Sequence, residues 1–124
     1  MAITLSTNLR NARLTAIVTE AGENAVIKLY TASYATLLGT LTCGTTLGTV
    51  SGGVLTFGVI TEDSQADAGG TFALAKLFKS DGTTEVLSGL TVGTSGTNII
   101  TSTADCTLNT PIYMTTATIT EGNA

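Results

Sequence analysis

The feature that most constrains the fold is the alternation, after Gly22, of short β-branched segments with glycine-containing turns. Val, Ile and Thr are enriched in strands, and frequent Gly marks the points at which a strand ends and the chain turns. Turn signals at this spacing are typical of a sandwich or barrel. We therefore expect a mainly β fold, a small antiparallel sandwich or jelly-roll-like barrel, with strands at 25–31, 37–42, 54–60, 71–80, 84–87, 98–102 and 112–120.

Two glycine-containing turns are the clearest local signals. Asp81-Gly82 joins the expected fourth and fifth strands, and this pair is typical of a tight hairpin turn with two positive φ angles. Gly52-Gly53 indicates a looser turn before the third strand. The remaining Gly-Thr pairs lack the Lys-Ser/Thr of a phosphate-binding loop and are interpreted as loop punctuation; they lie at Gly44, Gly48 and Gly96.

The segment before Gly22 has the spacing of a helix. Ser6 or Thr7 can cap its first turn, and Gly22 can end it in the left-handed conformation. Apolar residues three and four positions apart predict the buried stripe Leu9, Ala12, Ala16 and Ile17, with Arg10, Asn11 and Thr15 facing water.

The length of 124 residues suits one core. We expect a single domain spanning 1–124, with the helix at about 6–21, a β-rich region at 25–120 and a short flexible tail at 121–124.

Alternation in the last expected strand predicts two different faces. Tyr113, Thr115, Ala117 and Ile119 are expected to pack inward, leaving a threonine-rich face outward or against a partner. Arg10 and Arg13, three apart on the helix, could also clamp an acidic patch of a partner or simply be solvated. The interface candidates are therefore Arg10, Arg13, Ile112, Met114, Thr116, Thr118 and Thr120.

The composition argues against catalysis. There is no His, and Cys43 and Cys106 are the only thiols, so hydrolytic triads and common zinc sites lack their parts. We expect these cysteines to be buried thiols, with a disulfide as an open alternative. The acidic loop at 62–67, with Asp63 and Asp67, lacks a full calcium-loop pattern and is interpreted as solvated. We expect no catalytic residue, no metal site and no cofactor.

Charge and hydropathy bear on the partners. The net charge of −4 argues against binding to nucleic acid, which requires clustered Lys and Arg. No apolar run approaches the roughly 20 residues of a membrane-spanning helix, so no membrane partner is expected. The amino terminus shows no secretory signal, which favours synthesis in a cytoplasm.

Three stretches carry a resemblance: residues 5–13 (LSTNLRNAR), 49–55 (TVSGGVL) and 117–124 (ATITEGNA). Together they resemble small structural proteins of tailed bacteriophages and prophages. The resemblance implies a non-enzymatic virion component, with a capsid decoration or cement role that stabilises the head by binding the major capsid protein. We further expect the chain to form a homo-oligomer, a dimer or trimer on the capsid surface, and to be made in the host cytoplasm. The jelly-roll comparison is an architectural analogy.

Two alternatives remain. One is a tail or head-to-tail connector component, which would be present in far fewer copies than a cement protein. The other is a glycan-binding virion module, which would require aromatic side chains clustered on one exposed face. The aromatic candidates for that face are Tyr30, Tyr34, Tyr113 and Phe57.

Overall fold

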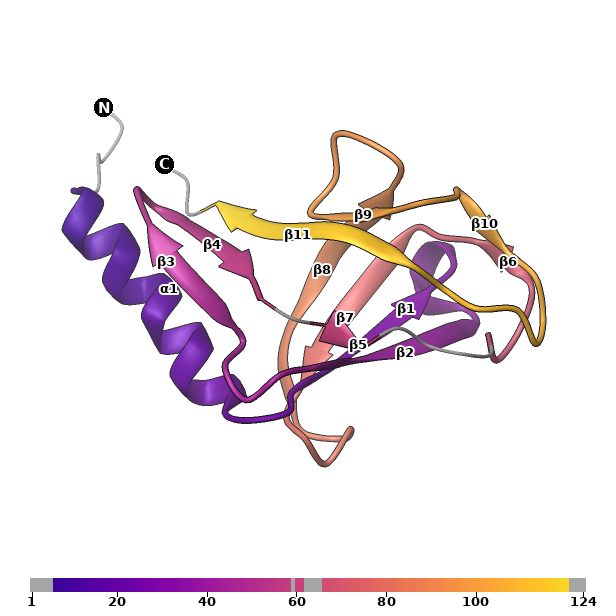
Figure 1. Cartoon of the computed structure of the whole chain (residues 1–124), viewed down its shortest axis with the longest axis horizontal. Coiled ribbons are helices and arrows are strands. Elements are labelled where there is room, and N and C mark those ends of the chain that lie inside the picture. Colours follow the sequence, from indigo (N-terminus) through magenta and orange to yellow (C-terminus); the bar gives the residue numbers. More distant parts are fainter. Residues whose placement is uncertain (1–5, 59, 62–65, 121–124) are drawn as a thin grey trace.

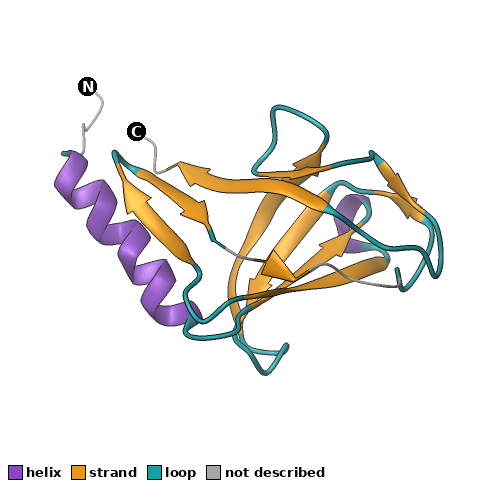
Figure 2. Ribbon diagram, viewed as in Figure 1, coloured by secondary structure: helices purple, strands orange, loops and turns teal. Residues whose placement is uncertain are grey.

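The computed structural model describes residues 6–58, 60–61 and 66–120. It contains one α-helix, α1 (Thr7–Ala21), and a short 3-10 turn, η1 (Ala32–Tyr34) (Figures 1 and 2). The strands are β1 (Val26–Tyr30), β2 (Leu37–Cys43), β3 (Gly48–Ser51), β4 (Val54–Phe57), β5 (Ile60–Thr61), β6 (Gly70–Thr71), β7 (Leu74–Phe78), β8 (Glu85–Gly93), β9 (Ile99–Thr101), β10 (Asp105–Cys106) and β11 (Met114–Thr120).

Most of the described strands belong to one sheet, in the order β3-β4-β11-β9-β8-β7-β1-β2-β5. Strand β4 pairs near one end of this order, and β5, which follows it closely in the chain, pairs with β2 at the other end. One short segment thus joins both ends, so the sheet curls into a half-barrel (Figure 1). The pairings are antiparallel except that of β8 with β9. The prediction of a small, mainly β fold with one helix is confirmed.

Alternation along the strands builds the core inside the curl. On β1, Ile27 and Leu29 are fully buried, while Lys28 and Tyr30 on the opposite face are half-buried. Leu41, Leu55 and Leu77 fill the same interior from neighbouring strands. Burial of such side chains contributes about 1.5–3 kcal/mol each and is the main force that holds the sheet in its curled form.

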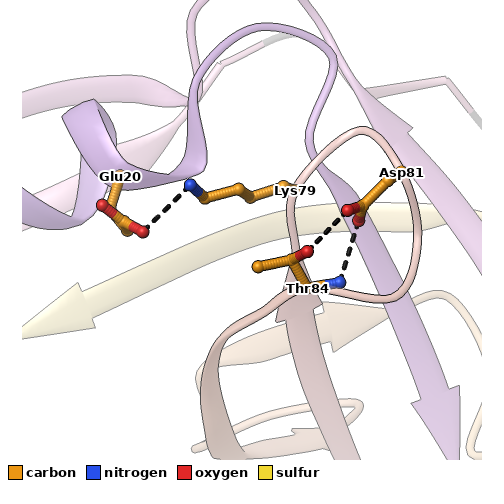
Figure 3. Close-up of polar contacts among 4 residues, drawn as sticks. All are labelled: Glu20, Lys79, Asp81 and Thr84. Carbon is orange, nitrogen blue, oxygen red and sulfur yellow. Dashed lines mark hydrogen bonds and ion pairs between the residues drawn. The ribbon is translucent and has the colours of Figure 1, made fainter.

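Helix α1 is held at both ends. The Ser6 hydroxyl accepts a hydrogen bond from the backbone N–H of Leu9 (3.1 Å), and Gly22, at φ 71°, donates to the carbonyl of Val18 (3.2 Å). Both predicted ends of the helix are confirmed. Lys79 pairs with Glu20 at 3.0 Å and links the last turn to the β7–β8 hairpin (Figure 3).

The buried face of α1 differs from the predicted stripe. Leu14 and Ala21 are buried, with Ile17 and Val18 partly buried, whereas Leu9 is 47% exposed. Ala12 and Ala16 are exposed too, and Arg10 and Asn11, expected in water, are half-buried. The larger side chains of Leu14, Ile17 and Val18 bury more apolar area than a stripe containing two alanines. In addition, Asn11 Oδ1 accepts a hydrogen bond from the N–H of Gly53 (2.8 Å), which fixes the rotation of the helix.

The β7–β8 hairpin forms where it was predicted, but with a different turn. Gly82 has φ 72°, whereas Asp81 is not among the positive-φ residues, so the expected pair of positive angles is wrong. Asp81 instead acts through its carboxylate, which accepts hydrogen bonds from the N–H and from the hydroxyl of Thr84 (Figure 3). It also accepts a hydrogen bond from the N–H of Thr83. The Thr84 bonds are the main cause that lowers the pKa of Asp81 to about 2.

The Gly52-Gly53 turn is tighter than expected. Both glycines have positive φ, 60° and 78°, and Ser51 pairs directly with Val54 across the turn. This is a two-residue hairpin, and it requires a strand before it. That strand, β3, was not predicted, and Gly48, interpreted as loop punctuation, is its first residue.

A bulge in β11 overturns the predicted faces of the last strand. Met114 pairs with Thr101 and Thr116 with Ile100, so one extra residue of β11 lies between the two pairs. An extra residue reverses the alternation on one side of it. Ile112 is therefore buried and Met114 packs against the core, while Tyr113, expected inside, is 49% exposed.

The corrected helix face predicts unequal effects of two identical substitutions. Leu14→Ala should lower the free energy of unfolding by about 2–5 kcal/mol, because it leaves a cavity in the core. Leu9→Ala, on the exposed side, should lower it by less than about 1 kcal/mol. Chemical denaturation of the two variants measures both values, and equal losses would contradict the assignment.

The hairpin predicts a pH-dependent contribution to stability. The lowered pKa of Asp81 means that its carboxylate stabilises the fold above about pH 4, and that this contribution is lost as the pH falls towards 2. Asp81→Asn should therefore have a lower Tm than wild type at pH 6, and the difference should shrink between pH 4 and pH 2. A Tm difference that stays constant over this range would show that the carboxylate charge contributes nothing.

Candidate functional site

The outer side of the β3–β4–β11 part of the sheet carries a continuous set of hydroxyl side chains. Residues on this side are exposed or half-buried, while Leu55 and Ala117 on the other side are buried. We call this surface the threonine face; it consists of Thr49, Ser51, Thr56, Thr116, Thr118 and Thr120.

Strand register aligns the hydroxyls in rows. Thr49 pairs with Thr56 across β3 and β4, and Thr56 pairs with Thr118 across β4 and β11. Paired residues on adjacent strands project from the same side, with the strands about 4.8 Å apart. The three hydroxyls therefore form one row across three strands. A parallel row contains Ser51 and Thr120 on either side of Val54.

The threonine face carries no charge. The four strands β3, β4, β9 and β11 contain no charged residue, and the chain has none between Lys28 and Glu62. Each Thr hydroxyl can donate one hydrogen bond and accept others. A surface of this kind can make many polar contacts without the large desolvation cost of buried charges.

Close packing of β3 against β4 supports the first row. A Cβ added to Gly48 would lie within 2.1 Å of the carbonyl oxygen of Thr56, so only glycine allows this approach. In the sequence, Gly48 belongs to a Gly-Thr pair, and such a pair indicates a loop unless strand β3 is predicted after it.

The predicted interface residues on or beside β11 form two groups, one on the outer surface and one facing the core. Thr116 and Thr120 are exposed on the threonine face and Thr118 is half-buried there, whereas Ile112 and Met114 point inward. Ile112 is buried and Met114 is half-buried against the core, so neither belongs to the threonine face. Strand β11 lies between β4 and β9: it pairs with β9 from Met114 to Ala117 and with β4 from Thr118 to Thr120.

The two helix arginines do not form a pair of equivalent surface cations. Arg10 is half-buried, donates from Nη2 to the Thr7 hydroxyl (3.2 Å) and lies against Gly53, where an added Cβ would be 2.8 Å from Nη1. Arg13 is exposed. The Arg10 guanidinium therefore packs on the β3–β4 turn.

The groups considered for chemistry lie apart. Cys43 is a buried free thiol, and burial raises its pKa to about 11, which keeps it protonated at neutral pH. Cys106 is also a free thiol, and its Sγ donates to the carbonyl of Ala68 (3.2 Å), but it is half-buried, so the prediction of a buried thiol is confirmed for Cys43 alone. Asp67 is exposed, and residues 62–65, including Asp63, lie outside the described residues. In the described part of the chain, no three His, Cys, Asp or Glu gather as a metal site.

The aromatic candidates are only partly brought together. The Tyr30 and Tyr34 rings meet edge-to-face, with centroids 5.4 Å apart. Phe57 is buried in the core, and Tyr113 is exposed on the segment before β11. Of the aromatic candidates for a glycan site, only Tyr30 and Tyr34 lie together.

No helix within the described ranges is long and apolar enough to cross a lipid bilayer. Comparisons of the chain with protein-family models, curated proteins and solved structures find no match.

The packing of β3 on β4 predicts that a single methyl group disrupts the first row. Gly48→Ala should lower the free energy of unfolding by at least about 2 kcal/mol, because the new Cβ meets backbone that cannot move independently. Gly58→Ala is the control: its nearest contact would be 3.8 Å, and it should change stability by less than about 1 kcal/mol. A tolerated Gly48→Ala would refute the close approach.

Proposed function

We propose that this chain is a non-enzymatic structural protein of a tailed-phage virion, a decoration or cement protein that binds the capsid surface through its threonine face. The observation that carries the proposal is the uncharged array of hydroxyls across β3, β4 and β11. The major capsid protein is the proposed partner, and copies of the chain are proposed to contact each other on the shell as dimers or trimers.

A weak contact can hold a protein on a shell when it is repeated by symmetry. A contact made of hydroxyls and small apolar groups gives modest affinity per copy, and it avoids burying unpaired charge. On a symmetric shell the same contact is repeated many times, and linked copies gain through multivalency. The resemblance of residues 5–13, 49–55 and 117–124 to small phage structural proteins supports the same role.

Copy number distinguishes this role from a connector or tail component. Particles of the phage that encodes the chain should be purified and the protein quantified against the major capsid protein. We expect hundreds of copies per particle. Tens of copies or fewer would favour the connector alternative, and absence from purified particles would refute a virion role.

Added charge on the threonine face should prevent attachment. In the double variant Thr116→Lys, Thr118→Lys, two ammonium groups would have to lose their water in the contact, while Ala117 and Ile119 still fill the core. We expect the purified protein to fold, and particles made with it to lose the protein and to open at a lower temperature than wild type.

The control places the same charges elsewhere. Ser80→Lys, Thr83→Lys adds two lysines at exposed positions of the β7–β8 hairpin, outside the threonine face. This variant should keep full occupancy and heat resistance. If the threonine-face variant folds and also keeps both, the face is only solvated and the interface assignment is wrong.

A further inference from the structure

A pair of lysines lies on the outer side of the sheet, away from the threonine face. Lys28 on β1 is directly opposite Lys76 on β7, and both side chains are half-buried. Like charges at directly opposite positions destabilise a sheet. The chain has only five basic residues and a net charge of −4, and two of these five lie directly opposite one another.

Aromatic rings flank the two ammonium groups. Lys28 Nζ lies over the Phe78 ring, 5.0 Å from its centroid, and Lys76 Nζ lies 4.6 Å from the centroid of Tyr34 and 5.9 Å from that of Tyr30. Lys76 also meets Glu85 at 3.4 Å, in an ion pair whose carboxylate side chain is 45% exposed. Among the described residues no carboxylate pairs with Lys28, so the group keeps one net positive charge.

Tyr34 is held in place beside Lys76 at a conformational cost. Ser33 and Tyr34 both have positive φ, 58° and 56°, which is unfavourable for residues with side chains. The Tyr34 hydroxyl accepts a hydrogen bond from the N–H of Gly89 (2.7 Å). Gly89 lies where β8 bulges opposite Lys76, so the bulge and the tyrosine fix each other.

We propose that this lysine–tyrosine surface binds a carboxylate-bearing polysaccharide, with the ammonium groups of Lys28 and Lys76 on the sugar carboxylates and the tyrosines beside the sugar rings. A bound anion would relieve the repulsion between the lysines. Sugar rings have apolar faces that pack on aromatic side chains. Thr40 on β2 lies opposite Lys28, in the same row as the two lysines. The proposal does not depend on the capsid role.

The geometry favours a polysaccharide over an acidic peptide. Strand β1 is paired with β2 and β7, and β7 is paired with β1 and β8. A peptide therefore finds no open backbone edge on which to add as a strand. The surface presents side chains only, which suits a ligand recognised through its rings and its charges.

The test titrates the full chain with three defined probes: hexagalacturonate, uncharged maltohexaose and the peptide hexaglutamate, by calorimetry and NMR. We expect hexagalacturonate to bind in preference to the other two, and to bind more weakly as salt is raised. Lys28→Thr should weaken this binding about tenfold, the loss typical of one charge-assisted contact. The Tm of Lys28→Thr should change little, because the loss of the repulsion offsets the loss of the contact with Phe78.

Lys79→Thr is the matched control, since it changes the net charge equally but acts on a lysine that pairs with Glu20. It should leave the affinity unchanged. The proposal is overturned by no binding of hexagalacturonate, by equal binding of maltohexaose or hexaglutamate, or by equal losses in the two lysine variants. Lys76→Thr provides a second variant should Lys28→Thr not fold, and unchanged affinity in whichever variant folds overturns the proposal too.

Discussion

Strands β4 and β5 follow one another in the chain but pair near opposite ends of one sheet, and this arrangement determines the shape of the fold. Strand β4 pairs with β3 and β11, and β5, close behind it, pairs with β2 at the opposite end of the sheet. The sheet must therefore curl, and apolar side chains that would otherwise cover one flat face come together in its interior. Helix α1 packs on β3 and β4, where Leu14 is fully buried. The helix alone would be marginally stable, so its packing on the hairpin is what keeps it folded.

The sequence predicts well those features that depend on residues close together in the chain. The β-branched segments between glycines give most of the strands, Ser6 and Gly22 give the helix ends, and Gly52-Gly53 and Asp81-Gly82 mark real turns. What fails depends on how a segment packs against its partners, whether they are near or far in the chain. Strand β3 contains a glycine that is explained only by its approach to Thr56, and its four residues carry little hydrophobic signal.

The faces of elements are the part of the candidate site that sequence reasoning predicts least well. The bulge before Thr116 depends on the pairing of β11 with β9, and with it Ile112 and Met114 pack inward. The rotation of α1 likewise depends on Asn11 bonding to Gly53, a contact between residues that are distant in the chain. Thr116, Thr118 and Thr120 follow the bulge in one uninterrupted stretch, so simple alternation predicts their common outer face.

The two outer surfaces of the curled sheet differ in charge. The threonine face has no charge, so contact with a partner costs little desolvation and gains little per copy, which suits a contact repeated by symmetry. The surface at Lys28 and Lys76 concentrates charge against the net charge of the chain, which costs stability and can favour only a ligand of opposite sign. These surfaces lie on different strands of one sheet, β3, β4 and β11 for the first and β1 and β7 for the second. Under the two proposals, the chain would be attached through the first surface and would present the second to solvent.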